Sequence, residues 1–288
     1  MMSASAAGPT VDLDASSRDA IAAFFASVAL AAGPVVMREY DRGCTVRAKQ
    51  DASPVTIADE LAEELILAQL RARASAIAIV AEESVARGAQ EAIGRSFILV
   101  DPLDGTREFI AGNGEFTINI ALVRDGAPAA GAVYAPALGR LWFAGEQAFV
   151  CPVEVGGALP DRSAWRRIGT RAAPPRDLIA LASRSHCDPA TEAFLARLPI
   201  GERRSAGSSL KFCELAEGVA DVYPRFAPTM EWDTAAGDAV LRAAGGAVRA
   251  VEGGPLRYGK RESALRNGGF VAWGDPGRAD AMLNETST

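Results

Sequence analysis

The chain has 288 residues, 49% of them apolar, and a formal net charge of −6. This length and apolar content suit one large domain, or two smaller ones, around a substantial core. Because the sequence has no block of Lys and Arg and only 7% aromatic residues, neither a nucleic-acid polymer nor an anionic membrane surface is favoured as a partner.

The four cysteines form no C-x-x-C pair, and the first residues lack the charged and apolar regions of a signal peptide. We therefore expect a cytoplasmic protein. Residues 21–37 are almost all apolar and approach membrane-spanning length. The alanines, Ser27 and the Gly33-Pro34 pair favour a buried first helix, kinked near Pro34, and no membrane span. Peripheral contact between this helix and the inner membrane stays open.

Residues 14–17 offer N-cap side chains for the first helix. A second helix is predicted to begin at Ser53 or Thr56, because apolar side chains recur behind them at helical spacing. Those side chains are Leu61, Leu65, Ile66 and Leu70. Asp59 then lies in the first turns of the second helix.

Short apolar runs predict four strands, at residues 77–80, 97–100, 117–123 and 130–134. The Arg-Asp-Gly sequence at 124–126 predicts a hairpin turn between the last two. Residues 133–136 and 141–144 are typical of paired strands. The first half of the chain is therefore expected to be rich in sheet.

Residues 150–175 are rich in Gly, Pro and Arg without strong periodicity, which indicates a connection. We place a boundary near Glu154, giving two α/β subdomains at 1–154 and 155–288. Beyond it, strands are predicted at 178–183 and 220–223. Helices are predicted at 189–197, 210–217 and 234–244, the last ended by Gly245-Gly246. Alternating strands and helices indicate an α/β architecture.

Acidic residues stand at the ends of several predicted elements. Asp101 and Asp104 follow one apolar run, Glu82 and Glu83 follow another, and Asp233 lies near the start of a predicted helix. A single Asp-rich turn is more often a capped or solvated loop than a metal site. Three such clusters at element ends change that judgement and indicate a shared site for hard cations.

Several common types of phosphate-handling site require residues that this sequence does not contain. The single histidine, His186, disfavours zinc sites built on several histidines and leaves one candidate for a Ser-His-Asp base. No cysteine has an arginine six positions later, and no G-x-x-x-x-G-K-[ST] sequence occurs. A calcium EF-hand fails because the twelfth position from Asp101 is Gly112, where a bidentate Glu is required.

Several carboxylates in one cleft would be strongly unfavourable as bare anions, since neighbouring charges and burial both raise their pKa values. Bound cations would offset that repulsion. With oxygen ligands alone, Mg²⁺ is the expected ion. The carboxylates concerned are Glu82, Asp101, Asp104 and Asp233.

The order and spacing of these clusters, together with residues 49–59, resemble the inositol monophosphatase superfamily of Mg²⁺-dependent, lithium-sensitive phosphomonoesterases. The resemblance runs from about Asp14 to Trp273. It looks closest to the 3′(2′),5′-bisphosphate nucleotidases, through residues 100–120 and 207–213. It implies alternating helix and sheet layers in two subdomains, with the site between them.

The resemblance also implies how two or three Mg²⁺ ions are held. Glu82, Asp101 and the Leu103 carbonyl would hold one ion, and Asp101, Asp104 and Asp233 a second, which makes Asp101 the bridge. Glu83 assists a third ion or a nearby water, or is merely solvated.

Catalysis would depend on a hydroxyl linked to a carboxylate. The resemblance implies that Thr106 and Asp59 orient and activate a water for in-line attack on phosphorus. From the residues alone, Asp59 fits equally well as an acidic residue that stabilises a helix N-terminus. Gly105 and Thr106 are expected to begin a helix whose backbone N–H groups face the phosphate, although the same residues also suit a plain helix start.

The substrate-binding residues follow from the same resemblance. Ser208, Lys211 and Arg225 would hold the 5′-phosphate and sugar of a nucleotide, with His186 near the base. From the residues alone, Lys211 equally suits a solvated helix position, and a Ser pair often caps a helix.

The expected reaction is removal of the 3′-phosphate from adenosine 3′,5′-bisphosphate, a step of sulfur assimilation, to give AMP and phosphate. One alternative is a phosphatase of inositol 1-phosphate or another sugar phosphate. A second is a catalytically silent sensor of metal or phosphonucleotide. The oligomeric state does not follow from the sequence.

Overall fold

The computed structural model describes residues 11–13, 15–43, 46–48, 54–74, 77–183 and 188–279. Its main elements are two sheets, of seven and five strands. The larger has the order β3-β4-β5-β6-β7-β8-β9, in which β3 is parallel to β4 and every other pair is antiparallel. Its strands are β3 (Ala78–Ala81), β4 (Ser96–Asp104), β5 (Thr117–Arg124), β6 (Ala127–Ala135), β7 (Arg140–Ala144), β8 (Ala148–Pro152) and β9 (Arg166–Arg167).

The smaller sheet has the order β11-β10-β12-β16-β14. Strand β10 is parallel to β11 and β12, whereas β16 runs antiparallel between β12 and β14. Its strands are β10 (Leu178–Ser183), β11 (Ile200–Ala206), β12 (Val222–Arg225), β14 (Ala247–Ala250) and β16 (Phe270–Trp273). Two short ladders complete the pairing, β1 (Val46–Ala48) with β2 (Pro54–Thr56) and β13 (Thr229–Met230) with β15 (Arg266–Asn267).

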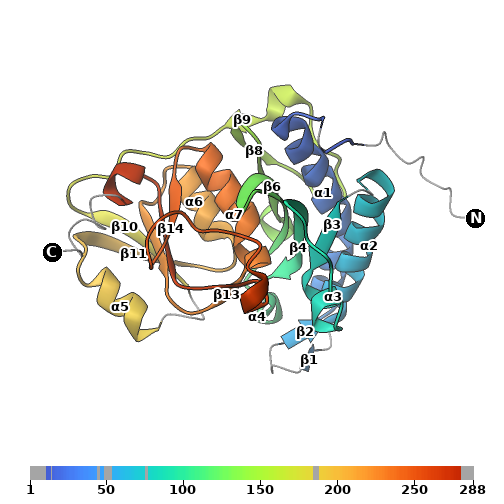
Figure 1. The fold of residues 1–288 in the computed structure, drawn as a ribbon, viewed down its shortest axis with the longest axis horizontal. Helices are drawn as coiled ribbons and strands as arrows, with labels where there is room; N and C mark the ends of the chain where they lie inside the picture. Colours follow the sequence, from blue (N-terminus) through green and yellow to red (C-terminus); the bar gives the residue numbers. More distant parts are fainter. Residues whose placement is uncertain are drawn as a thin grey trace, which may run out of the picture.

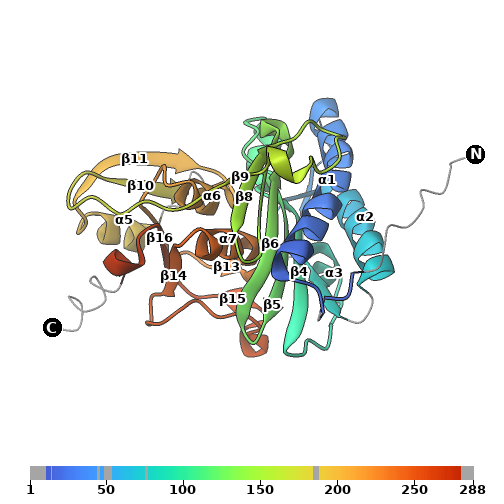
Figure 2. The same cartoon turned by 90° about the horizontal axis from the view of Figure 1, so that it is seen from above.

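The helices separate and cover these sheets as layers (Figures 1 and 2). Helices α1 and α2 lie on the outer face of the larger sheet, α6 and α7 lie between the two sheets, and α5 lies beyond the smaller sheet. The helices are α1 (Arg18–Arg42), α2 (Ile57–Arg73), α3 (Glu82–Ala86), α4 (Thr106–Ile110), α5 (Pro189–Leu195), α6 (Leu210–Ala216) and α7 (Glu231–Ala243). The predicted layering is confirmed.

Both faces of the larger sheet are buried, which explains the continuous apolar runs of its strands. In β4, Ile98 and Val100 pack towards α1 and α2, whereas Phe97 and Leu99 pack towards α6 and α7. A third apolar cluster, around Leu195 and Trp273, lies between the smaller sheet and α5. The middle layer, α6 and α7, is therefore enclosed between the two sheets.

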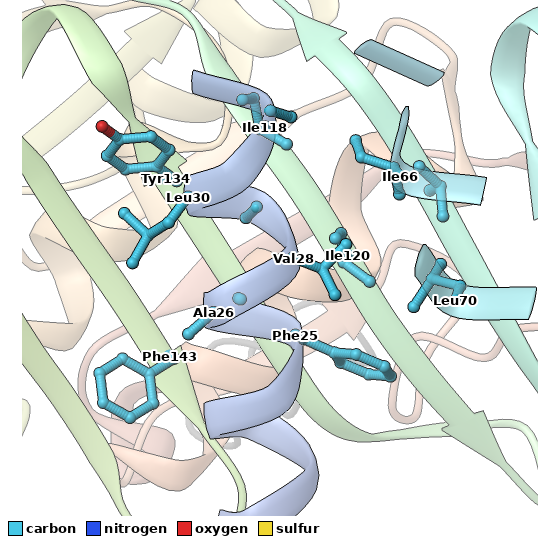
Figure 3. Packing of buried hydrophobic residues seen from close by; sticks show 14 of the residues in the cluster. Phe25, Ala26, Val28, Leu30, Ile66, Leu70, Ile118, Ile120, Tyr134 and Phe143 are labelled. Atoms are coloured by element: carbon cyan, nitrogen blue, oxygen red, sulfur yellow. The ribbon is translucent and has the colours of Figure 1, made fainter. Parts of the chain in front are cut away.

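Helix α1 is the buried first helix predicted from residues 21–37, and it continues through Pro34. Ser17 caps it, while Asp14 lies outside the described residues. Among the helices that the structure describes, α1 alone is long and apolar enough to cross a membrane. Here it packs on the larger sheet and α2 through fully buried side chains such as Phe25 and Val28, as a core helix does (Figure 3).

Most predicted elements are confirmed, and the differences have local causes. The strand predicted at 220–223 lies two residues later, as β12, and the helix predicted at 234–244 begins at Glu231. Strand β11 was missed because residues 201–205 are exposed and polar, without the alternation expected of a half-buried strand. Strands β14 and β16 were also missed. The boundary near Glu154 stays a prediction, and β9 joins the larger sheet from beyond it.

Candidate active site

The acidic segment of β4 forms a β-bulge. Asp101 pairs with Asn119 and Asp104 with Thr117, so that β4 has one residue more than β5 between these pairs. Residues three apart on a regular strand face opposite sides of the sheet. The extra residue allows Asp101 and Asp104 to line the same cavity. Pro102, which has no N–H to donate, lies within the bulge.

This cavity has a volume of about 400 Å³ and is lined by elements from both halves of the chain. Helix α3, the bulge of β4 and helix α4 contribute from the first half, and helices α6 and α7 and strand β12 contribute from the second. Most of the predicted site residues line it. They are Glu82, Asp101, Leu103, Asp104, Gly105, Thr106, Ser208, Lys211, Arg225 and Asp233.

Two predicted residues lie outside the cavity lining, and a third lies outside the described part of the chain. Asp59 is buried behind Thr106, Glu83 is a buried residue of α3, and neither lines the cavity. His186 lies outside the described residues. The roles expected for these three side chains remain predictions.

The carboxylates in the cavity raise one another's pKa values. Burial and the charges of Glu82, Asp104 and Asp233 raise the pKa of Asp101 well above the ordinary range for an aspartate. Burial and the same kind of repulsion raise the pKa of Asp233, and burial raises the pKa of Asp104 to about 6. A buried, all-oxygen cluster with unbalanced negative charge fits a hard divalent cation such as Mg²⁺.

The carboxylates suit Mg²⁺ by the chemistry of their oxygens and by their common position around one cavity. Within the described part of the chain, no three Asp, Glu, His or Cys side chains already form a group that could hold a metal ion. The assignment of ligands to individual ions therefore stays a prediction.

Asp59 joins two helices through its two oxygens. Oδ2 accepts hydrogen bonds from the Thr56 amide at 2.8 Å and the Thr56 hydroxyl at 2.7 Å, which caps α2. Oδ1 lies 3.3 Å from the Thr106 hydroxyl, which also lies 3.3 Å from the Leu103 carbonyl. The two interpretations of Asp59, helix cap and partner of Thr106, therefore coexist.

Gly105 allows the chain to turn sharply into α4. Its φ is +92°, and a Cβ there would lie 3.1 Å from the Glu115 carbonyl and 3.3 Å from the Ser208 Cβ. A larger residue would be strained and would push the two halves of the chain apart. The predicted helix start at Gly105 and Thr106 is confirmed, and its contact with phosphate stays a prediction.

Two residues outside the predicted site hold its parts together. Ser209 Oγ lies 3.1 Å from Asp104 Oδ2 and 2.7 Å from the Asp233 carbonyl, and it accepts a hydrogen bond from Asn119 at 3.0 Å. It therefore joins the β4 bulge to α7. Its neighbour Ser208, the residue that the sequence singled out, lines the cavity with a φ of +44°.

Glu63 is the second such residue, and it fixes the segment that carries Glu82. Its carboxylate accepts hydrogen bonds from the Glu83 amide at 2.7 Å, the Ser84 hydroxyl at 2.7 Å and Arg87 at 2.8 Å. The side chain is fully buried, although Arg87 is largely exposed. One signal was available in the sequence, since Glu63 follows Asp59 by four residues on the buried face of α2.

The cations opposite the carboxylates are restrained. The Lys211 ammonium is buried and donates to the carbonyls of Ala206 at 3.0 Å and Ser208 at 2.6 Å. Burial lowers the pKa of Lys211 to about 8, while the charge of Asp104 acts in the opposite direction. The alternative of a solvated lysine is therefore wrong. Arg225 is also buried and donates from Nε to the Ala227 carbonyl at 3.1 Å.

The model of the inositol monophosphatase family matches residues 17–287, and the chain belongs to that family. The 3′(2′),5′-bisphosphate nucleotidase CysQ of Salmonella typhimurium is 43% identical over 240 residues, covering 82% of this chain and 93% of the relative. CysQ of Escherichia coli K12 is 42% identical over 240 residues, with the same coverage.

Solved structures agree with this assignment. The crystal structure of CysQ from Bacteroides thetaiotaomicron, a bacterial member of the same family, has a TM-score of 0.71 at 40% identity, covering 88% of this chain and 96% of that one. An IMPase of Thermotoga maritima shares the fold, with a TM-score of 0.70 at 23% identity, covering 87% and 91%. The family resemblance and the fold class predicted from the sequence are both confirmed.

Proposed function

We propose that the protein is a Mg²⁺-dependent phosphomonoesterase that hydrolyses the 3′-phosphate of adenosine 3′,5′-bisphosphate to AMP and phosphate. One observation carries the proposal: a single cavity is lined by the four carboxylates expected to bind metal, Glu82, Asp101, Asp104 and Asp233, and by the buried cations Lys211 and Arg225. Carboxylates suit divalent ions at the reacting phosphate, and cations suit a second phosphate. The names of the relatives from Salmonella and Escherichia support this choice.

The residues divide the work as follows. Glu82, Asp101 and the Leu103 carbonyl would hold one ion, and Asp101, Asp104 and Asp233 a second. When bound, Mg²⁺ would supply positive charge to the phosphate oxygens and lower the pKa of water. Glu83, a buried residue of α3, would support a third ion through the segment that it shares with Glu82.

Thr106 and Asp59 move the proton. The Thr106 hydroxyl lies within reach of Asp59 Oδ1, so it would donate its own proton to Oδ1 and accept one from the attacking water. Asp59 is oriented for this role because Thr56 occupies its other oxygen. Held in this way, Thr106 would deprotonate the nucleophile at a fixed position in line with phosphorus.

The second half of the chain recognises the nucleotide. Lys211 and Arg225 would bind the phosphate that is not cleaved, and Ser208 would bind the sugar. Pro228, Met230 and Trp232 add an apolar wall to the cavity, against which a nucleobase can stack. An inositol ring has no planar aromatic face with which to stack in this way.

A substrate panel tests the proposal. We expect adenosine 3′,5′-bisphosphate to be hydrolysed faster than inositol 1-phosphate or fructose 1,6-bisphosphate at matched concentration and saturating Mg²⁺. Preference for either competitor would favour the sugar-phosphate alternative, and no turnover of any would favour the silent sensor. We place the reaction in the cytoplasm and expect lithium to inhibit it.

A further inference from the structure

A further cation lines the cavity, on the side of the short ladder between β13 and β15. Arg266 belongs to β15 and is among the lining residues. Its side chain is exposed and forms no hydrogen bond or ion pair with any residue that the structure describes. Lys211 and Arg225, by contrast, are buried and donate to backbone carbonyls. Arg266 is therefore more available than Lys211 or Arg225 as a donor to an anion in the cavity.

The backbone around Arg266 is fixed to the first turn of α7, which carries Asp233. Arg266 pairs with Met230 in the ladder, and the carbonyl of its neighbour Leu265 accepts a hydrogen bond from the Glu231 amide at 2.9 Å. On the other side, the side-chain amide of Asn267 donates to the Met230 carbonyl and to the Thr234 hydroxyl, both at 3.0 Å. The Cα of Arg266 therefore keeps a set position relative to the cavity.

The loop that leads to Arg266 is anchored to the same turn. The buried carboxylate of Glu231 accepts hydrogen bonds from the backbone amides of Gly259 at 2.6 Å and Lys260 at 2.9 Å, and it forms an ion pair with the Lys260 ammonium at 2.9 Å. Only the Arg266 side chain itself must be ordered when a ligand binds. Such a preorganised backbone reduces the entropy lost on binding.

We infer that Arg266 is a specificity-determining residue that binds the phosphate that is not cleaved. The inference rests on the proposed function. A guanidinium can donate two parallel hydrogen bonds to one phosphate, which a lysine cannot do. Lys211 and Arg225 would meet this phosphate from the buried side of the cavity, and Arg266 would meet it from the exposed side. Arg266 would then select substrates with two phosphates over those with one.

The test compares adenosine 3′,5′-bisphosphate with adenosine 3′-monophosphate, which has the same scissile phosphate and lacks the second. In Arg266→Gln, we expect kcat/KM for the bisphosphate relative to the monophosphate to fall roughly tenfold, mainly through KM, as for the loss of one charge-assisted contact. Inhibition by AMP, which keeps the 5′-phosphate, should weaken by a similar factor. Arg266→Lys should recover part of the preference.

Arg261→Gln is the matched control. Arg261 is exposed, lies in the same loop and does not line the cavity, so its removal should leave both substrates unaffected. If Arg266→Gln behaves like Arg261→Gln while the wild-type enzyme prefers the bisphosphate, the role of Arg266 is wrong and the proposed function stands. If the wild-type enzyme does not hydrolyse the bisphosphate, the proposed function itself is wrong.

Discussion

The Thr106 hydroxyl lies 3.3 Å from Asp59 Oδ1, although 47 positions separate the two residues in the sequence. We expect Thr106→Val and Asp59→Asn each to lower kcat by roughly 100-fold or more, the usual contribution of a positioned proton acceptor. Because the proposed mechanism makes the two groups one unit, the double variant should lose little more activity than either single variant. Multiplying losses in this double-mutant cycle would show that the residues act separately.

Asp101 lies at the centre of the acidic cluster. We expect Asp101→Asn to abolish Mg²⁺-dependent turnover while the fold is kept, because the change would remove the proposed bridging ligand and also a buried charge. In the absence of Mg²⁺, the thermal midpoint of the variant should equal or exceed that of the wild type, since repulsion with Glu82 and Asp233 is relieved. Turnover in the variant at high Mg²⁺ would show that the ligand assignment is wrong.

The same repulsion predicts how Mg²⁺ affinity depends on pH. Burial and repulsion raise the pKa values of Asp101 and Asp233, and burial raises that of Asp104 to about 6. Protons therefore compete with Mg²⁺ as the pH falls towards 6, and the Mg²⁺ concentration for half-maximal activity should rise. An unchanged Mg²⁺ requirement between pH 8 and pH 6 would contradict this expectation.

The same pKa shifts predict how the stability of the fold depends on pH. A carboxylate whose pKa is higher in the folded than in the unfolded state stabilises the fold while it is protonated, and this contribution is lost as the pH rises through the folded value. Without Mg²⁺, the contribution of Asp104 should be lost as the pH rises from about 4 to beyond 6. The rise in thermal midpoint on adding Mg²⁺ should therefore be larger at pH 8 than at pH 5.5.

A substitution at Glu63 should disturb the proposed metal site indirectly, through the segment that carries Glu82. Glu63→Gln keeps the shape of the side chain but weakens its hydrogen bonds to the start of α3, so Glu82 should be held less firmly. We expect a higher Mg²⁺ concentration for half-maximal activity and a smaller thermal shift on adding Mg²⁺, with kcat at saturating Mg²⁺ affected less. The neighbouring Glu64 is exposed, and Glu64→Gln should match the wild type in both measurements.

Tyr134 allows a prediction about the core, far from the chemistry. Its hydroxyl is fully buried and has no hydrogen-bond partner among the residues that the structure describes, and burial raises the pKa of the phenol. Tyr134→Phe removes an unsatisfied polar group at almost constant volume, so the free energy of unfolding should stay constant or rise by about 1 kcal/mol. A clear loss of stability in urea titrations would mean that the hydroxyl has a partner.

Contiguous features were the ones that the sequence could predict. Both aspartates of the bulge lie in one apolar strand, and Asp59 lies just behind a helix cap, so local patterns placed them correctly. The start of α7 was predicted too late because its cap, Met230, has no typical capping side chain. Asp233 caps the helix instead by accepting a hydrogen bond from the Met230 amide at 2.8 Å.

The residues that the sequence missed act across large separations. Ser209 could not be told from Ser208 by pattern, because its contacts with Asp104 and Asp233 exist only once the two halves meet. Arg266 lies in a strand of two residues, too short to give a periodic signal. Its position in the cavity depends on pairing with Met230, which no local rule specifies.

Side chains of a strand alternate with a period of two residues, so an insertion elsewhere in β4 would invert every residue beyond it and exchange the two apolar layers that flank the sheet. The extra residue in the bulge at Asp101–Asp104 produces one such inversion locally. Residues 97–100 therefore keep their packing, while both aspartates face the same cavity. The number of residues between the two aspartates therefore cannot change without turning one of them away from the cavity.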